Sequence, residues 1–259
     1  MMLRLLALLL LSITSGLAQQ GLNIIPLTTD TTITRHMEGQ MQKTPFSFTV
    51  TNPPANQDLL IIVNGLDWIS NPDVLISTKN RSPNFIQESE YFCYVFGADV
   101  CPIPASALKE GTTFYISVFC PWTCSFTIHA QYTTETYLEL NKKTTLIFTG
   151  EDEHSAQGKV VKFTIPQDFK SDHILIEASP RDTDSLDYNL GLFINQGNTI
   201  PSATLSQAQG APSWHGGVTF SLKSPHPLYC AGCSYTMLVT TSDSIPVDII
   251  AREATQDVK

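Results

Sequence analysis

The sequence predicts an all-β protein in which two tandem β-sandwich domains of jelly-roll type follow a signal peptide. Three observations lead to this prediction. Short apolar segments of strand length alternate with turn-forming residues, and the sequence shows no long helical periodicity. The order of these segments repeats, with corresponding points about 110–115 residues apart. The N-terminal residues have the composition of a secretory leader.

The leader is the stretch "MMLRLLALLLLSITSGLA", residues 1–18. Arg4 precedes an apolar block from Leu5 to Leu11, and small residues follow up to Ala18. This pattern predicts cleavage after Ala18, whereas a membrane anchor needs a run of roughly 20 apolar residues. No later stretch is apolar enough to span a bilayer. We therefore expect the mature chain to be secreted or displayed at a cell surface.

We expect the first domain to span residues 19–134. Its strands are predicted at residues 45–50, 58–63, 72–77, 112–119 and 125–132. The segment "DLLIIV" (58–63) is continuously apolar, which is typical of a strand buried on both faces. The segment "PASALKEG" (104–111) is long enough for one or two helical turns at most.

We expect the second domain to span residues 135–259 and to repeat the first. After a strand at 144–150, three segments match the strands of the first domain in order: 160–165 with 45–50, 172–178 with 58–63, and 187–195 with 71–77. Two further matches are 221–230 with 107–116, and "CSYTMLV" (233–239) with "CSFTIHA" (124–130). The chain is therefore interpreted as a tandem duplication.

The six cysteines are expected to form disulfides, because secretion places them in an oxidising compartment. The closely spaced pairs are Cys120 with Cys124 and Cys230 with Cys233, and we expect each to staple the end of a β-hairpin. Pro121 and Gly232 suit the required turns. Pairing of the remaining Cys93 and Cys101 is the simplest completion, although six cysteines allow fifteen connectivities.

Two other roles for the C-x-x-C motif are less favoured. A reactive dithiol gains acidity from a helix N-terminus or a nearby cation, but a strand pattern without Lys or Arg follows Cys233. A zinc site needs four ligands, and the comparable cysteine pair belongs to the other repeat.

No sequence motif predicts catalysis. G-x-S-x-G, H-E-x-x-H, Walker and G-x-G-x-x-G motifs are missing from the sequence. The His-Gly-Gly of "SWHGGV" (213–218) resembles an oxyanion loop, but a glycine turn explains it more simply. We therefore expect no catalytic residue and no cofactor, with calcium left open.

Carboxylates and aromatic rings in loops are the candidate ligand groups. Asp182, Asp184 and Asp187 are weak calcium candidates, whereas the acidic segment 150–158 is better explained as a solvated loop. Three tryptophans, Trp68, Trp122 and Trp214, lie in predicted loops. An exposed ring there can anchor a sugar or a protein ligand, and a packed ring covers the sandwich edge.

The chain's surface chemistry limits its partners. The sequence has 15 Lys and Arg against 24 Asp and Glu, and its formal net charge is −9 at pH 7. Such an acidic chain is not expected to bind nucleic acid or anionic membranes. Asn80-Arg81-Ser82 is an N-glycosylation acceptor, with Pro83 after it lowering its use. The expected partner is an extracellular protein or glycan.

Several segments resemble the pre-peptidase C-terminal domain, a β-sandwich module appended to secreted microbial proteases. The matching positions are Asp73 before an apolar strand, the segment 111–115, and Phe126-Thr127, with Asp187 and Tyr235-Thr236 in the second repeat. The second repeat departs from the pattern where "SPHPLY" replaces the Gly-Thr strand. The cysteines look similar to those of versions in protist surface proteins. The resemblance implies a non-catalytic module that binds or positions another molecule, and no metal site transfers.

These observations together predict a secreted or cell-surface, non-catalytic binding or adhesion module. The alternative is the non-catalytic N-terminal region of a larger membrane-anchored receptor or secreted hydrolase. A secreted enzyme with an unrecognised site is a third hypothesis, which a convergent His, Asp and Ser cluster in one pocket would support.

Overall fold

The fold is built from strands in four sheets, as the computed structural model of the chain shows. The described residues are 22–29, 31–67, 69–94, 99–133, 135–148, 157–181, 190–213, 216–241 and 244–254. These residues contain no α-helix, and their helical turns are the 3-10 turns Ile86–Glu88 and Ala105–Ala107. The predicted all-β class is confirmed, while the predicted signal peptide lies outside the described residues.

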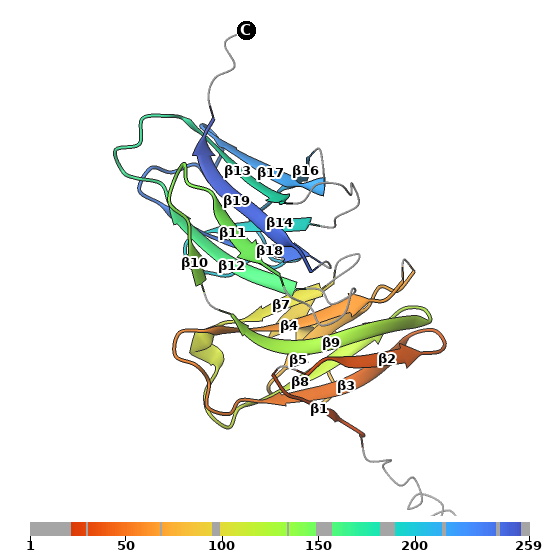
Figure 1. Cartoon of the computed structure of the whole chain (residues 1–259). Helices are drawn as coiled ribbons and strands as arrows, with labels where there is room; N and C mark the ends of the chain where they lie inside the picture. The colour runs from red at the N-terminus through yellow and green to blue at the C-terminus, as the bar shows by residue number, and fades with distance from the viewer. Residues whose placement is uncertain are drawn as a thin grey trace, which may run out of the picture.

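The first unit, residues 22–133, is a sandwich of two sheets (Figure 1). One sheet runs in the order β1 (Ile25–Leu27), β3 (Gln42–Thr49), β8 (Thr113–Cys120), β5 (Asp73–Ser77) and β6 (Tyr91–Cys93). The other runs in the order β2 (Ile33–Met37), β9 (Cys124–Thr133), β4 (Asp58–Gly65) and β7 (Asp99–Ile103). β1 pairs with β3 in parallel, and the other pairs are antiparallel.

The second unit, residues 135–254, is also a two-sheet sandwich. Its first sheet runs in the order β10 (Glu135–Tyr137), β12 (Gln157–Thr164), β18 (Ser234–Thr241), β14 (Leu190–Gln196) and β15 (Ala208–Gln209). Its second runs in the order β11 (Thr144–Ile147), β19 (Pro246–Glu253), β13 (His173–Pro180), β17 (Val218–Lys223) and β16 (Ala211–Pro212). The parallel pairing of β10 with β12 repeats that of β1 with β3.

The strand orders of the two units match except for the additional edge strand β16 of the second unit, but the repeat aligns differently from the prediction near its end. β18 takes the place of β8, and β19 takes the place of β9. The predicted match of 233–239 with 124–130 is therefore wrong, because 124–130 lies in β9 and 233–239 enters β18. The shared Cys-Ser-aromatic-Thr letters suit the start of any strand after a cysteine turn. The true closing strand, β19, was missed.

Each unit has its own apolar core between its two sheets. In the first core Phe46 and Phe126 meet edge to face, with ring centroids 6.3 Å apart. In the second, the rings of Phe163 and Tyr235 stack at 4.9 Å, and the buried Tyr235 hydroxyl donates to the Leu228 carbonyl. Burying each such side chain contributes about 2 kcal/mol relative to exposing it. Two closed cores explain why each unit keeps its sandwich geometry.

A third apolar cluster joins the two units. Leu60, Ile62 and Val100 of the first unit pack with Val160 and Leu238 of the second. The sheet containing β4, β7 and β9 thus lies against the sheet containing β12 and β18 (Figure 1).

This contact confirms that the segment 58–63 is buried on both faces. Leu59, Ile61 and Val63 enter the first unit's core, whereas Leu60 and Ile62 enter the cluster between the units.

Candidate functional site

The described cysteines form three disulfides and none is free. The bonds join Cys93 to Cys101, Cys120 to Cys124, and Cys230 to Cys233, which are the pairs expected from the sequence. Their Cα–Cα separations are 5.7, 6.3 and 5.4 Å, within the roughly 7 Å that a disulfide can bridge. The closely spaced pairs therefore bend the backbone where they lie.

The two closely spaced disulfides do not close hairpins, so that part of the prediction is wrong. Cys120 ends β8 and Cys124 begins β9, and these strands belong to different sheets. The Cys230–Cys233 bridge precedes β18 and follows β17, which again lie in different sheets. Each bridge therefore fixes a crossing from one sheet to the other. Gly232 has the positive φ, +82°, that its place in the turn requires.

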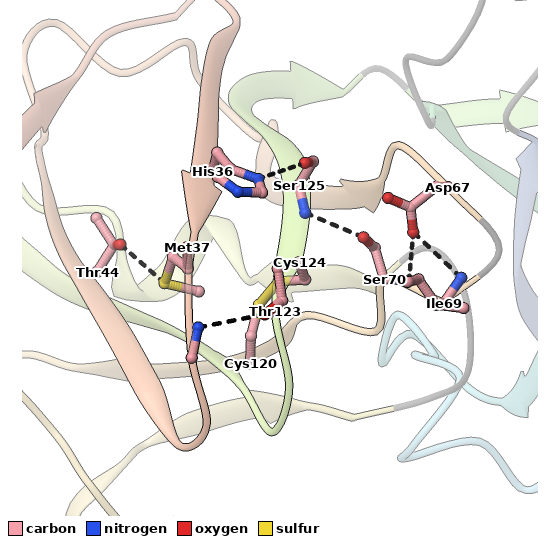
Figure 2. Close-up of a disulfide and its surroundings, with 11 residues drawn as sticks. His36, Met37, Thr44, Asp67, Ile69, Ser70, Cys120, Thr123, Cys124 and Ser125 are labelled. Atoms are coloured by element: carbon pink, nitrogen blue, oxygen red, sulfur yellow. Dashed lines mark hydrogen bonds between the residues drawn. A yellow bond between two sulfur atoms is a disulfide. The ribbon is translucent and has the colours of Figure 1, made fainter.

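Three loops meet around the Cys120–Cys124 bridge (Figure 2). We call residues 38–41, 66–67 with 69–72, and 121–123 the loop tip. The Gly39 N–H donates to Thr123 Oγ1 at 3.2 Å, and the Met41 N–H donates to the Pro121 carbonyl at 3.2 Å. The disulfide-held turn is thereby tied to the neighbouring loop.

The third loop is tied in by side chains that Figure 2 draws. The Ser125 N–H donates to Ser70 Oγ at 3.0 Å. Asp67 Oδ1 accepts from the N–H groups of Ser70 at 2.7 Å and Ile69 at 3.1 Å. Hydrogen bonds from Ser70 lead the effects that lower the pKa of Asp67, so its carboxylate stays ionised and holds the loop.

The loop tip presents three large apolar side chains to solvent. Met41 is 69% exposed, Trp122 is 62% exposed and Ile69 is 52% exposed. Of the two roles open to Trp122, the structure therefore favours the exposed ring over packing on the sandwich edge. Trp68 and Trp214 lie outside the described residues. Met41 was missed, although an apolar residue in the polar stretch "EGQMQK" is a usable signal.

A histidine, a serine and a glutamate stand together beside the loop tip. His36 Nδ1 is 2.8 Å from Ser125 Oγ across the β2–β9 pairing, and His36 Nε2 is 3.8 Å from Glu38 Oε1. The Glu38 side chain is 89% exposed. None of the three lines either of the two cavities described below. A similar pair, His173 with Ser221 at 2.8 Å, occurs in the second unit and indicates cross-strand surface bonding.

A cavity of about 580 Å³ lies on the outer face of the β5–β8 sheet. Asp73 of β5 and Phe119 of β8 are paired across the two strands, so their side chains share one face. That face is the outer one, because the alternating residues Val74 and Val118 enter the core. Phe85, Ile86 and Tyr94 are exposed residues that also line this cavity.

The loop that connects β5 with β6, residues 78–90, is tied to the same outer face. Lys43 Nζ of β3 donates to the Ser82 carbonyl at 3.2 Å and also to Asn84 Oδ1. The Arg81 guanidinium lies 5.7 Å from the ring centroid of Tyr115 on β8. These contacts hold the loop against the sheet and so give the cavity its wall.

Asn80, the predicted glycosylation residue, takes part in this loop. Its Nδ2 donates to Glu88 Oε2 at 2.8 Å, and its Oδ1 accepts from the Ser82 N–H at 3.0 Å. The nitrogen that would carry a glycan is thus hydrogen-bonded in the folded chain. Glycosylation at Asn80 stays a prediction.

Asp73 is the charged member of the described cavity lining. Burial raises the pKa of its carboxyl to about 6. No hydrogen bond or ion pair to another described residue offsets that burial. A half-buried carboxylate without a partner is costly, and such groups concentrate at functional sites. In the sequence Asp73 stands out only as a mark of the family resemblance, and its place in a cavity depends on the pairing with β8.

A second cavity of about 550 Å³ lies between the units. Its lining includes Asp58, Tyr91 and Phe92 of the first unit and Asn198 and Ser202 of the second. Burial is the main cause that raises the pKa of Asp58, against a hydrogen bond from the Ala105 backbone. The Cys93–Cys101 bridge also lines this cavity.

The predicted calcium candidates Asp182, Asp184 and Asp187, and most of the acidic segment 150–158, lie outside the described residues. Within the part of the chain that the structure describes, no three His, Cys, Asp or Glu side chains are grouped as a metal site. No helix among those same residues has the length and hydropathy needed to cross a membrane.

Comparison with known proteins adds little to this geometry. No family model and no curated protein matches the chain, so the resemblance to the pre-peptidase C-terminal domain stays a prediction. The CUB1-EGF-CUB2 domain of human MASP-1/3 aligns at 8% identity with a TM-score of 0.21, covering 85% of this chain and 99% of that one. The CUB1-EGF-CUB2 domains of rat MASP-1 align at 8% identity with a TM-score of 0.21, covering 88% and 99%. Overlaps this weak support no inference about fold or function.

Proposed function

We propose that the chain is an extracellular, non-catalytic binding or adhesion module whose ligand contacts the loop tip. The observation that supports this proposal is the exposed ring of Trp122 on a turn closed by the Cys120–Cys124 disulfide. Three disulfides in one chain are typical of an oxidising, extracellular environment.

The loop tip combines exposure with rigidity, which is the combination that binding anchors need. An aromatic ring that is already held in place loses little conformational entropy on binding and buries a large apolar area. Trp122 sits within a bridged turn, and that turn is hydrogen-bonded to the loop carrying Met41. Loops at the end of a sandwich are common binding surfaces because the scaffold positions them.

The side chains at the loop tip favour a protein surface over a glycan. Met41 and Ile69 add flexible and branched apolar groups beside the indole of Trp122. Such apolar groups fill pockets on a protein partner, whereas they add little to the binding of a sugar, which relies on a stacking ring and hydrogen bonds.

The experiment is a binding screen of the chain from residue 19 against extracellular-matrix proteins and a glycan array, with and without calcium. We expect binding to a protein, weakened at least tenfold in Trp122→Ala, as for an anchor worth about 1.4 kcal/mol or more. Ile147→Ala, which removes an apolar side chain 53% exposed in the second unit, is the matched control. Unchanged binding by Trp122→Ala would reject the loop tip, and binding to nothing would favour a structural spacer.

A further inference from the structure

The cavity beside β5 has a floor that only the sheet pairing assembles. Asp73, Leu75 and Phe119 come from β5 and β8 and point to the outer face. Lys43 of β3 lies opposite Phe119, so Asp73, Phe119 and Lys43 form one row across three neighbouring strands. Its ammonium is bonded to Ser82 and Asn84 in the loop 78–90. The ammonium of Lys43 is therefore occupied by the loop and is not the counter-charge of Asp73.

The cavity rim is aromatic and apolar. Phe85 is 63% exposed, and Ile86 and Tyr94 are exposed beside it. The ring of Tyr94 stacks on that of Phe92 at 5.7 Å, which holds it in place. Large apolar side chains that face solvent around a cavity mark a ligand site more often than a random surface does.

The chemistry of this lining selects among cations. A calcium or magnesium ion needs six or more oxygen ligands, and the described lining holds a single carboxylate. An ammonium or guanidinium group needs one counter-charge, and aromatic faces attract it further. The apolar rim suits a hydrocarbon stem attached to that group.

We propose that this cavity is a binding site for an organic cation, an ammonium or guanidinium group on an apolar stem, with Asp73 as its counter-ion. Lysine and arginine side chains of a partner and free amines share this chemistry. The proposal goes beyond the loop-tip function and does not depend on it, because Trp122 and Met41 do not line this cavity.

Binding of the cation at Asp73 is expected to weaken as pH falls. The cation pairs with the ionised carboxylate, and the pKa of Asp73 is about 6. Ionisation is nearly complete at pH 7.5 and about tenfold lower at pH 5, so affinity falls about tenfold between them. The neighbouring charged groups are Lys43, held by the loop, and Glu88, which accepts from Asn80 and Asn84. Tyr94 is the other titratable group on the rim.

The test is an NMR titration of the chain from residue 19 with n-butylammonium, n-butylguanidinium and the neutral 1-butanol, at pH 7.5 and 5. We expect both cations to shift resonances around β5 and the loop 78–90, with affinity about tenfold lower at pH 5 and at least tenfold lower for 1-butanol. A short peptide with a free or an acetylated lysine forms a further arm. Binding by the free-lysine peptide assigns the site to a protein partner, and binding by butylammonium alone assigns it to free amines.

Variants locate the site. Asp73→Asn and Phe85→Ala should each weaken butylammonium binding at least tenfold, whereas Asp168→Asn, an exposed aspartate in the second unit, should leave it unchanged. Phe85 is a solvent-exposed loop residue, so its variant tests the site even if Asp73→Asn perturbs the strand. Equal binding of 1-butanol, equal binding by Asp73→Asn, or no pH dependence would overturn the proposal. Trp122→Ala should bind butylammonium normally, which separates this result from the loop-tip test.

Discussion

Gly158 of the second unit lies directly against Leu60 of the first. A β-carbon at position 158 would stand 3.0 Å from Leu60 Cδ1 and 3.2 Å from Val100 Cγ1. The Gly158 carbonyl accepts from Gln131 Nε2 at 3.1 Å. The two sandwiches can approach this closely because residue 158 has no side chain.

We therefore predict that Gly158→Val separates the two units. The added side chain must displace packed atoms on both sides, which costs about 1–3 kcal/mol. Denaturant unfolding should show that loss, and small-angle scattering should show a more extended chain. Thr164→Val, at an exposed position of the same strand, is the control. An unchanged scattering profile would contradict the role assigned to this glycine.

We predict that Asp73→Asn stabilises the folded chain at neutral pH. The folded pKa of about 6 lies above the unfolded value of 3.8, so the folded state binds its proton more tightly. This contribution is present at low pH and is lost as pH rises through about 6. Replacing the carboxyl with an amide should raise the free energy of unfolding at pH 7.5 by about 1 kcal/mol after allowance for partial exposure.

The measurement is urea unfolding of Asp73→Asn and the natural chain at pH 7.5 and pH 4. The difference between them should shrink at pH 4, where Asp73 carries its proton. Equal stability of the two proteins at both pH values would mean that the Asp73 carboxylate is solvated and that its burial costs no free energy. Loss of stability at pH 7.5 would point to an undetected partner of the carboxylate.

A second pH effect is predicted at His129, which lies opposite Ile62 and faces the second unit. Burial lowers the pKa of its imidazole, while a hydrogen bond with Gln131 raises it. The unfolded chain therefore binds a proton more readily below about pH 6.5, and stability falls as pH drops through that range. His129→Gln should lose less stability than the natural chain between pH 7.5 and pH 5. Identical pH dependence would rule this out.

The cysteine pairs should be covalent in the folded protein. Peptide mapping without reduction should find Cys120 joined to Cys124 and Cys230 joined to Cys233, since a direct bond is the arrangement the structure shows. Free thiols, or a bridge from either Cys230 or Cys233 to Cys93, would contradict it.

Removing the loop-tip bridge should cost stability. Replacing both Cys120 and Cys124 with serine opens a small loop, and the chain-entropy model assigns such a bridge about 2 kcal/mol. The unfolding free energy of this double variant measures the cost. The same variant should weaken ligand binding at Trp122 more than the stability loss alone explains, because the ring is no longer held.

Local patterns predicted much of the chain's organisation. The alternation of "PFSFTV" and the apolar run of "DLLIIV" identified β3 and β4, because the burial pattern of a strand follows from the order of apolar and polar residues along it. The close spacing of Cys120 with Cys124, and of Cys230 with Cys233, identified their partners, because residues so near in sequence reach each other through a single turn. The resemblance of the repeats also led to a predicted division between units near residue 134, which stays a prediction.

Local patterns failed where the outcome depends on which strands become neighbours. The match of "CSYTMLV" with "CSFTIHA" wrongly equated residues 233–239 with the β9 segment 124–130. A likeness of four residues carries no information about which strands pair in a sheet. The same limit led to the hairpin interpretation of both closely spaced disulfides. They lie at crossings between sheets.

The sequence by itself determined an all-β chain and two closely spaced cysteine pairs, because each of these is decided by residues close together in the chain. Only the tertiary structure decided that Asp73 and Phe119 share one outer face, that the loop 78–90 walls it, and that Leu60 and Ile62 meet the second unit. These relationships come from pairing between segments that are distant in the sequence. Bringing such segments together and removing water from the polar groups between them depend on the whole packed fold.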